Sequence, residues 1–149
     1  MKELLQPGLQ VVSSFGELLP TVRGVLEKLT LGGQKRIGYV SGIVSSDGPD
    51  KIQENIERLK RFTDSVRSTH QFPVFSATDI FTDRIYEVCN RERKITQSEF
   101  IDFWRELLNS KLITDLFMTP RWDESEGATD EHTFAEQLGL NIHYISPKV

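Results

Sequence analysis

The chain has 149 residues, 38% of them hydrophobic and 9% aromatic, which is enough for one domain with a single core and too few for two independent domains. Its net charge of -4 argues against the basic surface that long nucleic acid requires. One cysteine and three histidines exclude an internal disulfide and offer no Cys/His metal-ligand spacing. Because no apolar run approaches the roughly 18 residues of a spanning helix, we expect a cytoplasmic protein without a membrane partner.

Residues 1–36 are predicted to form an N-terminal helical extension. Apolar residues recur at helical spacing from Phe15 to Leu29, and Gly32-Gly33 closes the segment. Such an amphipathic segment can cover an edge of the core, form a subunit interface or close over a site, and the first two roles are favoured. The remaining residues, 37–149, are predicted to form a single α/β domain.

From residue 37 the pattern alternates between short apolar strands and amphipathic helices. Strands are predicted at 37–41, 72–76, 113–118 and 141–145, and helices at 49–68, at 85–88, at 96–109 and around residue 131. This alternation predicts a Rossmann-like or flavodoxin-like fold, with a mostly parallel sheet and helices on both faces. Ligands of such folds bind beyond the carboxyl ends of the strands, here the loops 41–49, 76–83 and 119–127.

Glu131 is a carboxylate on the apolar face of its predicted helix. On a helical wheel it falls between Phe134, Ala135 and Leu138, while polar residues occupy the opposite face. A charge that faces the core needs a partner, a cleft or a chemical role. Interaction with the helix dipole, worth about 0.3 to 1 kcal/mol, does not explain the inward angle. We therefore favour a functional Glu131 over a tolerated, half-exposed acid.

The chemistry that best fits such a carboxylate is glycosyl transfer. The sequence lacks the Gly-x-Ser-x-Gly and Gly-x4-Gly-Lys-Ser/Thr patterns, and the loop 41–48 does not fit the dinucleotide-binding Gly-x-Gly-x-x-Gly pattern. In glycosyl transfer one acid attacks the anomeric carbon while a second group protonates the leaving base. Asp79, at the crevice end of the second predicted strand, is one candidate for that second group.

Several motifs together resemble a known superfamily. They are Tyr39-Val-Ser-Gly42, Thr114-Asp-Leu-Phe-Met-Thr-Pro120, Ser125-Glu-Gly127 and Glu131-x3-Ala135-x3-Gly139. This set is similar to the signature of the nucleoside 2-deoxyribosyltransferase-like superfamily, which includes deoxynucleoside monophosphate N-hydrolases. The resemblance covers about residues 37–145.

The resemblance implies roles for individual residues. Glu131 would be the nucleophile, Asp102 the nearest equivalent of the proton-donating acid, and the substrate would contact Tyr39, Ser41, Gly42, Ser125 and Gly127. Ser125 and Gly127 are equally well explained as turn residues. The resemblance also implies a homo-oligomer and no metal or redox cofactor.

Two features depart from the pattern of that superfamily. Relatives that bind a 5'-phosphate often carry an arginine in the loop after the first strand, where this chain has Ser45, Ser46 and Asp47. Asp102 falls opposite the apolar stripe of its predicted helix, so it faces solvent or a neighbouring subunit.

The expected function is cleavage or transfer at the N-glycosidic bond of a (deoxy)nucleoside or nucleoside monophosphate, by an N-glycosidase or a nucleoside deoxyribosyltransferase. One alternative is a non-catalytic module that binds a nucleotide or sugar phosphate in the same crevice. Another is a structural domain that binds a partner through its N-terminal helix.

Overall fold

The structure is a computed structural model that describes residues 1–91 and 93–147, so the end of the predicted domain 37–149 lies outside the described residues. Its helices are α1 (Lys2–Leu9), α2 (Leu18–Leu31), α3 (Ile52–Thr69), α4 (Ala77–Ile80), α5 (Asp83–Cys89), α6 (Gln97–Asn109) and α7 (Glu126–Leu138). Its strands are β1 (Gly38–Ser41), β2 (Val74–Ser76), β3 (Asp115–Met118) and β4 (Asn141–Tyr144). Short 3-10 turns are η1 (Phe15–Glu17), η2 (Pro49–Lys51) and η3 (Trp122–Glu124).

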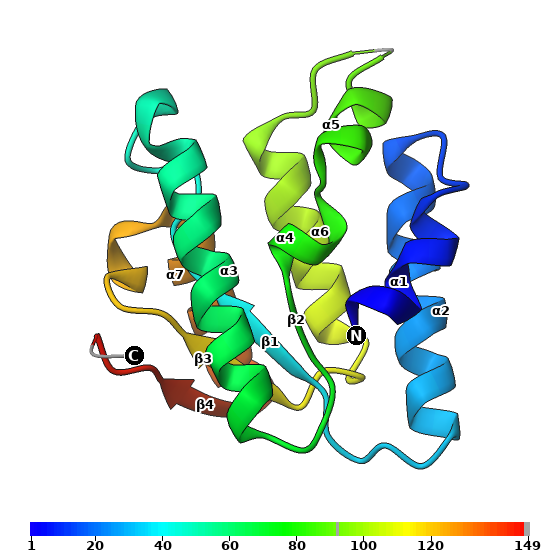
Figure 1. The fold of residues 1–149 in the computed structure, drawn as a ribbon, viewed down its shortest axis with the longest axis vertical. Coiled ribbons are helices and arrows are strands. Elements are labelled where there is room, and N and C mark those ends of the chain that lie inside the picture. Colours follow the sequence, from blue (N-terminus) through cyan, green and yellow to red (C-terminus); the bar gives the residue numbers. More distant parts are fainter. Residues whose placement is uncertain (92, 148–149) are drawn as a thin grey trace.

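The four strands form one sheet in the order β2-β1-β3-β4, and every pair is parallel. Figure 1 shows α3 on one side of this sheet and α2, α6 and α7 on the other. The predicted α/β fold of the Rossmann or flavodoxin type is confirmed. None of the helices within residues 1–91 and 93–147 is long and apolar enough to cross a membrane.

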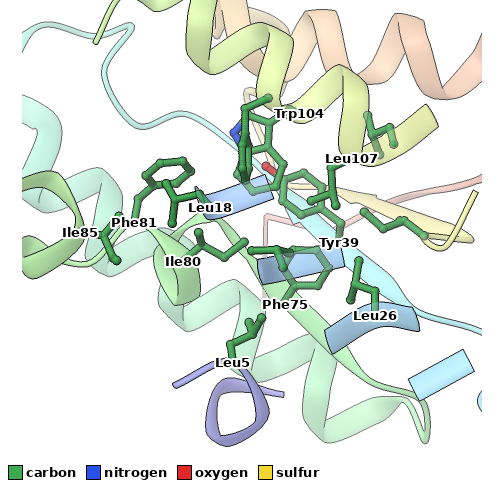
Figure 2. Close-up of a cluster of buried hydrophobic side chains, with 14 of the residues drawn as sticks. Leu5, Leu18, Leu26, Tyr39, Phe75, Ile80, Phe81, Ile85, Trp104 and Leu107 are labelled. Atoms are coloured by element: carbon green, nitrogen blue, oxygen red, sulfur yellow. The ribbon is translucent and has the colours of Figure 1, made fainter. Parts of the chain in front are cut away.

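Alternate residues of β1 point to opposite faces of the sheet. Val40 packs with Leu59 and Phe62 of α3. Tyr39 belongs to the larger core on the other face, where Figure 2 shows it among side chains of α2, α4, α6 and β2. Because the side-chain period of a strand is two, Ser41 shares the face of Tyr39. Both side chains are therefore directed toward the layer formed by α6 and α7.

Residues 1–36 contribute to that larger core. Leu5, Leu18, Val22 and Leu26 are all fully buried in it. Helix α2 packs against α6, and α1 packs against α2 and α4. Of the three roles considered for this segment, the structure shows it covering the core (Figure 1).

Leu26→Ala is expected to lower the free energy of unfolding by about 2–5 kcal/mol, because it removes a fully buried side chain and leaves a cavity. Urea denaturation followed by circular dichroism measures this loss. Leu31→Ala is the matched control in the same helix, since Leu31 is 87% exposed. An equal loss in both variants would contradict the packing of α2 into the core.

Asp115 ties three segments together at the end of the sheet where the strands begin. Its fully buried carboxylate accepts hydrogen bonds from Arg36 Nη2 at 2.6 Å, Thr114 Oγ1 at 2.6 Å and His143 Nε2 at 2.8 Å. Burial alone raises the pKa of Asp115, but these hydrogen bonds and the charge of Arg36 outweigh it and lower the pKa to about 2. The ionised form of Asp115 is therefore stabilised by folding.

Asp115→Asn is expected to lower the free energy of unfolding at pH 7 by about 2 kcal/mol. The folded pKa lies below the unfolded value, so in the native sequence this contribution is complete above pH 4 and is lost as the pH falls toward 2. Urea unfolding between pH 2 and 7 should show that the difference between the two proteins shrinks in acid. Asp64→Asn, at a carboxylate that is 75% exposed, should change stability by less than about 0.5 kcal/mol.

Candidate functional site

Glu131 lies on the inward face of α7 and is only 5% exposed, as its helical-wheel position predicted. The Tyr39 hydroxyl donates to its Oε1 at 2.5 Å, and the Ser41 hydroxyl donates to its Oε2 at 3.1 Å. Two side chains of β1 thus bind both oxygens of one carboxylate. This arrangement joins the first strand to the last helix across the crevice end of the sheet.

The start of α7 sets the direction in which Glu131 points. Ser125 is the N-cap, and its hydroxyl accepts a hydrogen bond from Ala128 N at 3.1 Å. Gly139 ends the helix in the left-handed conformation, with φ of 73°. The cap fixes where the helix begins, and the helical period then places Glu131 opposite β1.

Burial raises the pKa of Glu131 to about 7, against the hydrogen bonds from Tyr39 and Ser41, which lower it, and with a smaller contribution from the charge of Asp130. Burial also raises the pKa of Tyr39 well above 10, and the charge of Glu131 adds to that shift. Tyr39 therefore remains a hydrogen-bond donor across the physiological range. Glu131 exchanges its proton near neutral pH, as a group that works as a base or nucleophile requires.

Glu131 and Tyr39 open onto a pocket of about 420 Å³, a volume typical of sites for small molecules. One part of its wall is polar and comes from Gly42, Ser45, Ser46, Ser125, Gly127 and Glu131. Another part is aromatic and comes from Phe81, Tyr86, Phe100 and Trp104. A ligand with a hydroxyl-rich half and a flat apolar half matches this division.

The structure brings most of the predicted binding residues to this pocket. Tyr39, Gly42, Ser125 and Gly127 line it, whereas Ser41 touches Glu131 from the side of the strand. Ser125 both caps α7 and lines the pocket, so the two interpretations of this residue are compatible.

Gly42 has a steric reason of its own to be glycine. A Cβ there would lie 2.2 Å from Thr119 Oγ1, a distance that no side chain can occupy. The Thr119 hydroxyl is held in this position because it donates to Ser41 O at 3.0 Å. Glycine at this position therefore reflects close packing of β1 against the end of β3.

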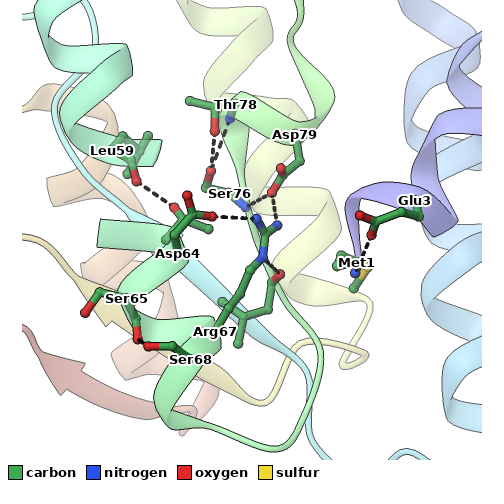
Figure 3. A network of polar contacts seen from close by, with 12 residues as sticks. Met1, Glu3, Leu59, Asp64, Ser65, Arg67, Ser68, Ser76, Thr78 and Asp79 are labelled. Atoms are coloured by element: carbon green, nitrogen blue, oxygen red, sulfur yellow. Dashed lines mark hydrogen bonds and ion pairs between the residues drawn. The ribbon is translucent and has the colours of Figure 1, made fainter. Parts of the chain in front are cut away.

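Asp79 does not line the pocket, although its position at the end of β2 is as expected. Figure 3 shows its carboxylate bound to Arg67, at 2.6 Å, and to the backbone N–H of Ser76, at 2.9 Å. The bond to Ser76 closes the capping box of α4. These contacts give Asp79 a structural task, and they direct it away from Glu131.

Asp102 is exposed on α6 and does not line the pocket of its own chain. The acid that does share the pocket with Glu131 is the adjacent Asp130, whose carboxylate is bound by Arg105 through Nε at 2.9 Å and Nη2 at 2.5 Å. The two nitrogens of Arg105 thus engage both oxygens of Asp130. Neither predicted second acid therefore meets Glu131 within one chain.

The aromatic wall is the part of the site that sequence reasoning did not identify. Phe100 and Trp104 have the helical spacing of core residues, and this spacing does not distinguish a core residue from a pocket residue. In the structure the Trp104 ring lies 4.6 Å from the Tyr39 ring, between centroids. The aromatic wall thus reaches the residue that holds Glu131.

Within residues 1–91 and 93–147, no group of three or more His, Cys, Asp or Glu side chains is arranged to hold a metal ion. Comparison with protein-family models, with curated proteins and with solved structures gave no match. Fold and pocket geometry, together with the motifs in the sequence, are therefore the basis for a functional assignment.

Glu131→Gln is expected to raise the free energy of unfolding by about 3 kcal/mol above pH 7. The folded pKa is raised to about 7 from 4.5, so the native protein loses stability as the pH rises between these values, whereas the amide cannot ionise. Below pH 4, where Glu131 is protonated in the folded protein, the ionisation of Glu131 should no longer cause a difference between the free energies of unfolding of the two proteins. Urea unfolding from pH 4 to 9 measures the gap, with Glu106→Gln as an exposed control on α6. A gap that does not depend on pH would contradict a buried Glu131 that titrates near neutrality.

Proposed function

We propose that the protein cleaves or transfers at the N-glycosidic bond of a (deoxy)nucleoside or nucleoside monophosphate, with Glu131 as the nucleophile. The observation that carries this proposal is a buried carboxylate that receives two hydroxyl hydrogen bonds and lines a pocket together with small polar and aromatic residues. A nucleoside has the same two halves, a hydroxylated sugar and a flat base. The resemblance of the motifs at Tyr39 and Glu131 to the nucleoside 2-deoxyribosyltransferase-like superfamily supports the same chemistry.

In the first step, an oxygen of the Glu131 carboxylate attacks C1' of the sugar, and the bond between C1' and the base nitrogen breaks. The electron pair of that bond remains on the base nitrogen, which takes up a proton. In the second step, water or an N–H nitrogen of another base attacks C1', displaces the Glu131 carboxylate and releases its proton to solvent. Water gives hydrolysis and a second base gives transfer.

Tyr39 and Ser41 are suited to position the nucleophile. Their hydroxyls hold both oxygens of Glu131 and would orient one of them toward the sugar. The same hydrogen bonds hold its pKa below the value that burial alone would impose, which keeps a useful fraction of Glu131 ionised at neutral pH.

We propose that solvent entering beside the exposed lining residues Ser45, Ser46 and Gln97 supplies the proton for the leaving base. Asp79 is bound to Arg67, and Asp130 is bound to Arg105. Asp102 is exposed, and it would serve the reaction only by reaching the pocket of a second copy in a homo-oligomer.

Base release from a panel of nucleosides and nucleoside monophosphates, followed by chromatography, tests the proposal. Glu131→Gln should lower kcat/KM by at least about 10³-fold, because it removes the nucleophile. In the native protein, kcat/KM should rise with pH and level off above about 7, since the ionised form of Glu131 reacts. Asp123→Asn, at an exposed acid that does not line the pocket, should retain native activity. Base release that survives in the Glu131 variant would refute the nucleophilic role.

A non-catalytic binding module is the second candidate. It is favoured by one observation: Asp130, which lines the pocket, and Asp79, a predicted proton donor, are both engaged by arginines. Stabilisation of the protein by nucleosides in thermal unfolding, without base release over hours, would select this function over catalysis.

A further inference from the structure

We infer that the pocket accepts an uncharged nucleoside and discriminates against its 5'-phosphate. This inference rests on the proposed function and specifies its substrate class. Three independent features of the pocket and its rim support it: the charges of the lining residues, the occupancy of the α7 N-terminus and the partners of the nearby cations.

No lysine or arginine is among the described residues that line the pocket, whereas Asp130 and Glu131 are. A phosphate monoester carries a charge near -2 at pH 7. Sites that recognise such a group usually supply an arginine or a lysine. Here a phosphate would instead meet two acidic lining residues: Glu131, and Asp130, whose charge is paired with Arg105.

The N-terminus of α7 faces the pocket, where an anion would normally bind, but three of the four N–H donors of its first turn already have acceptors. Glu126 N donates to Ser46 Oγ at 3.2 Å, and Ala128 N donates to Ser125 Oγ at 3.1 Å. Thr129 N donates to the Ser125 carbonyl at 2.9 Å. Among the described contacts, Gly127 N is the one donor of this turn without an acceptor. One N–H suits a sugar hydroxyl or ether oxygen better than a dianion.

Three further cations lie outside the pocket lining, on segments that flank it, and have partners of their own. Arg121 binds Glu124 at 2.7 Å and lies 3.5 Å from Asp47, in the loop that follows β1. Arg58 donates to the Pro120 carbonyl at 2.8 Å.

Lys51, the residue directly before α3, is exposed, and its Nζ lies 3.6 Å from Glu54 Oε2. The rim therefore balances each of these cations with a carboxylate or a carbonyl. Each of these three cations already has a partner when a phosphate approaches.

The remaining polar groups of this wall are neutral hydroxyls. Ser45 and Ser46 are exposed at the pocket mouth, where each can donate to and accept from a ribose hydroxyl. The wall thus complements an uncharged 5'-OH, for which neither a cation nor a helix terminus is required.

The test compares each common 2'-deoxyribonucleoside with its 5'-monophosphate. We expect kcat/KM for base release to be at least about tenfold higher for the nucleoside at low salt. Raising ionic strength from about 0.01 to about 1 M shortens the screening length from about 30 to about 3 Å, so the preference should narrow. Equal use of both compounds, or a preference for the monophosphate, would overturn the inference while leaving the proposed function intact.

Asp47→Asn gives a second, local test. It removes one rim charge and one of the two carboxylates that face Arg121, so the ratio of kcat/KM for monophosphate to that for nucleoside should rise about threefold or more. Glu27→Gln removes the same charge from an exposed position on α2 and should leave the ratio unchanged. An unchanged ratio in Asp47→Asn would count against the electrostatic origin of the selectivity.

Calorimetric binding separates this inference from the proposed reaction. Dissociation constants of the same compound pairs are measured with the native protein and with Glu131→Gln. Suppose that no base is released, yet the nucleoside binds at least about tenfold tighter than the monophosphate. The proposed reaction is then refuted, whereas the inferred preference for an uncharged nucleoside is retained. Tighter binding of the monophosphate overturns the inference whether or not turnover occurs.

Discussion

The hydrogen bonds from Tyr39 and Ser41 to the buried Glu131 are the constraint on which the site depends. Burial of a carboxylate is unfavourable unless its oxygens are satisfied, and here the satisfying hydroxyls come from a strand far away in sequence. The pair of bonds forms only when β1 lies beside β3 in register and α7 packs on the face of Tyr39. The site is therefore complete only when the chain has folded with this topology.

Folding does not optimise this carboxylate for stability. At neutral pH the burial of Glu131 outweighs its two hydrogen bonds, as its raised pKa of about 7 shows, whereas Asp115 at the other end of the sheet has its pKa lowered to about 2. The difference lies in the partners. Asp115 faces an arginine, and Glu131 faces only neutral hydroxyls. A buried group whose charged form is destabilised in this way is typical of functional sites rather than of structural ion pairs.

Local patterns predicted much of this arrangement, and their failures have physical causes. Helical period placed Glu131 on the inward face of α7 and Asp102 on an exposed face, since both depend only on the angle per residue. The partners of Asp79 depend on where Arg67 of α3 falls, which no local pattern specifies. Likewise, Phe100 and Trp104 have the spacing of core residues, and only the assembled layers show that they border a pocket.

The N-terminal helices bear on the site through this aromatic wall. Phe15, at the turn before α2, lies 6.1 Å from Phe103 between ring centroids, and Phe103 lies 5.0 Å from Trp104 on the same helix, α6. Trp104 in turn lies against Tyr39, the donor to Glu131. A continuous line of packed rings therefore runs from the first helices to the carboxylate. Through these contacts, residues outside the α/β motifs set the shape of the space in which a flat ligand would lie.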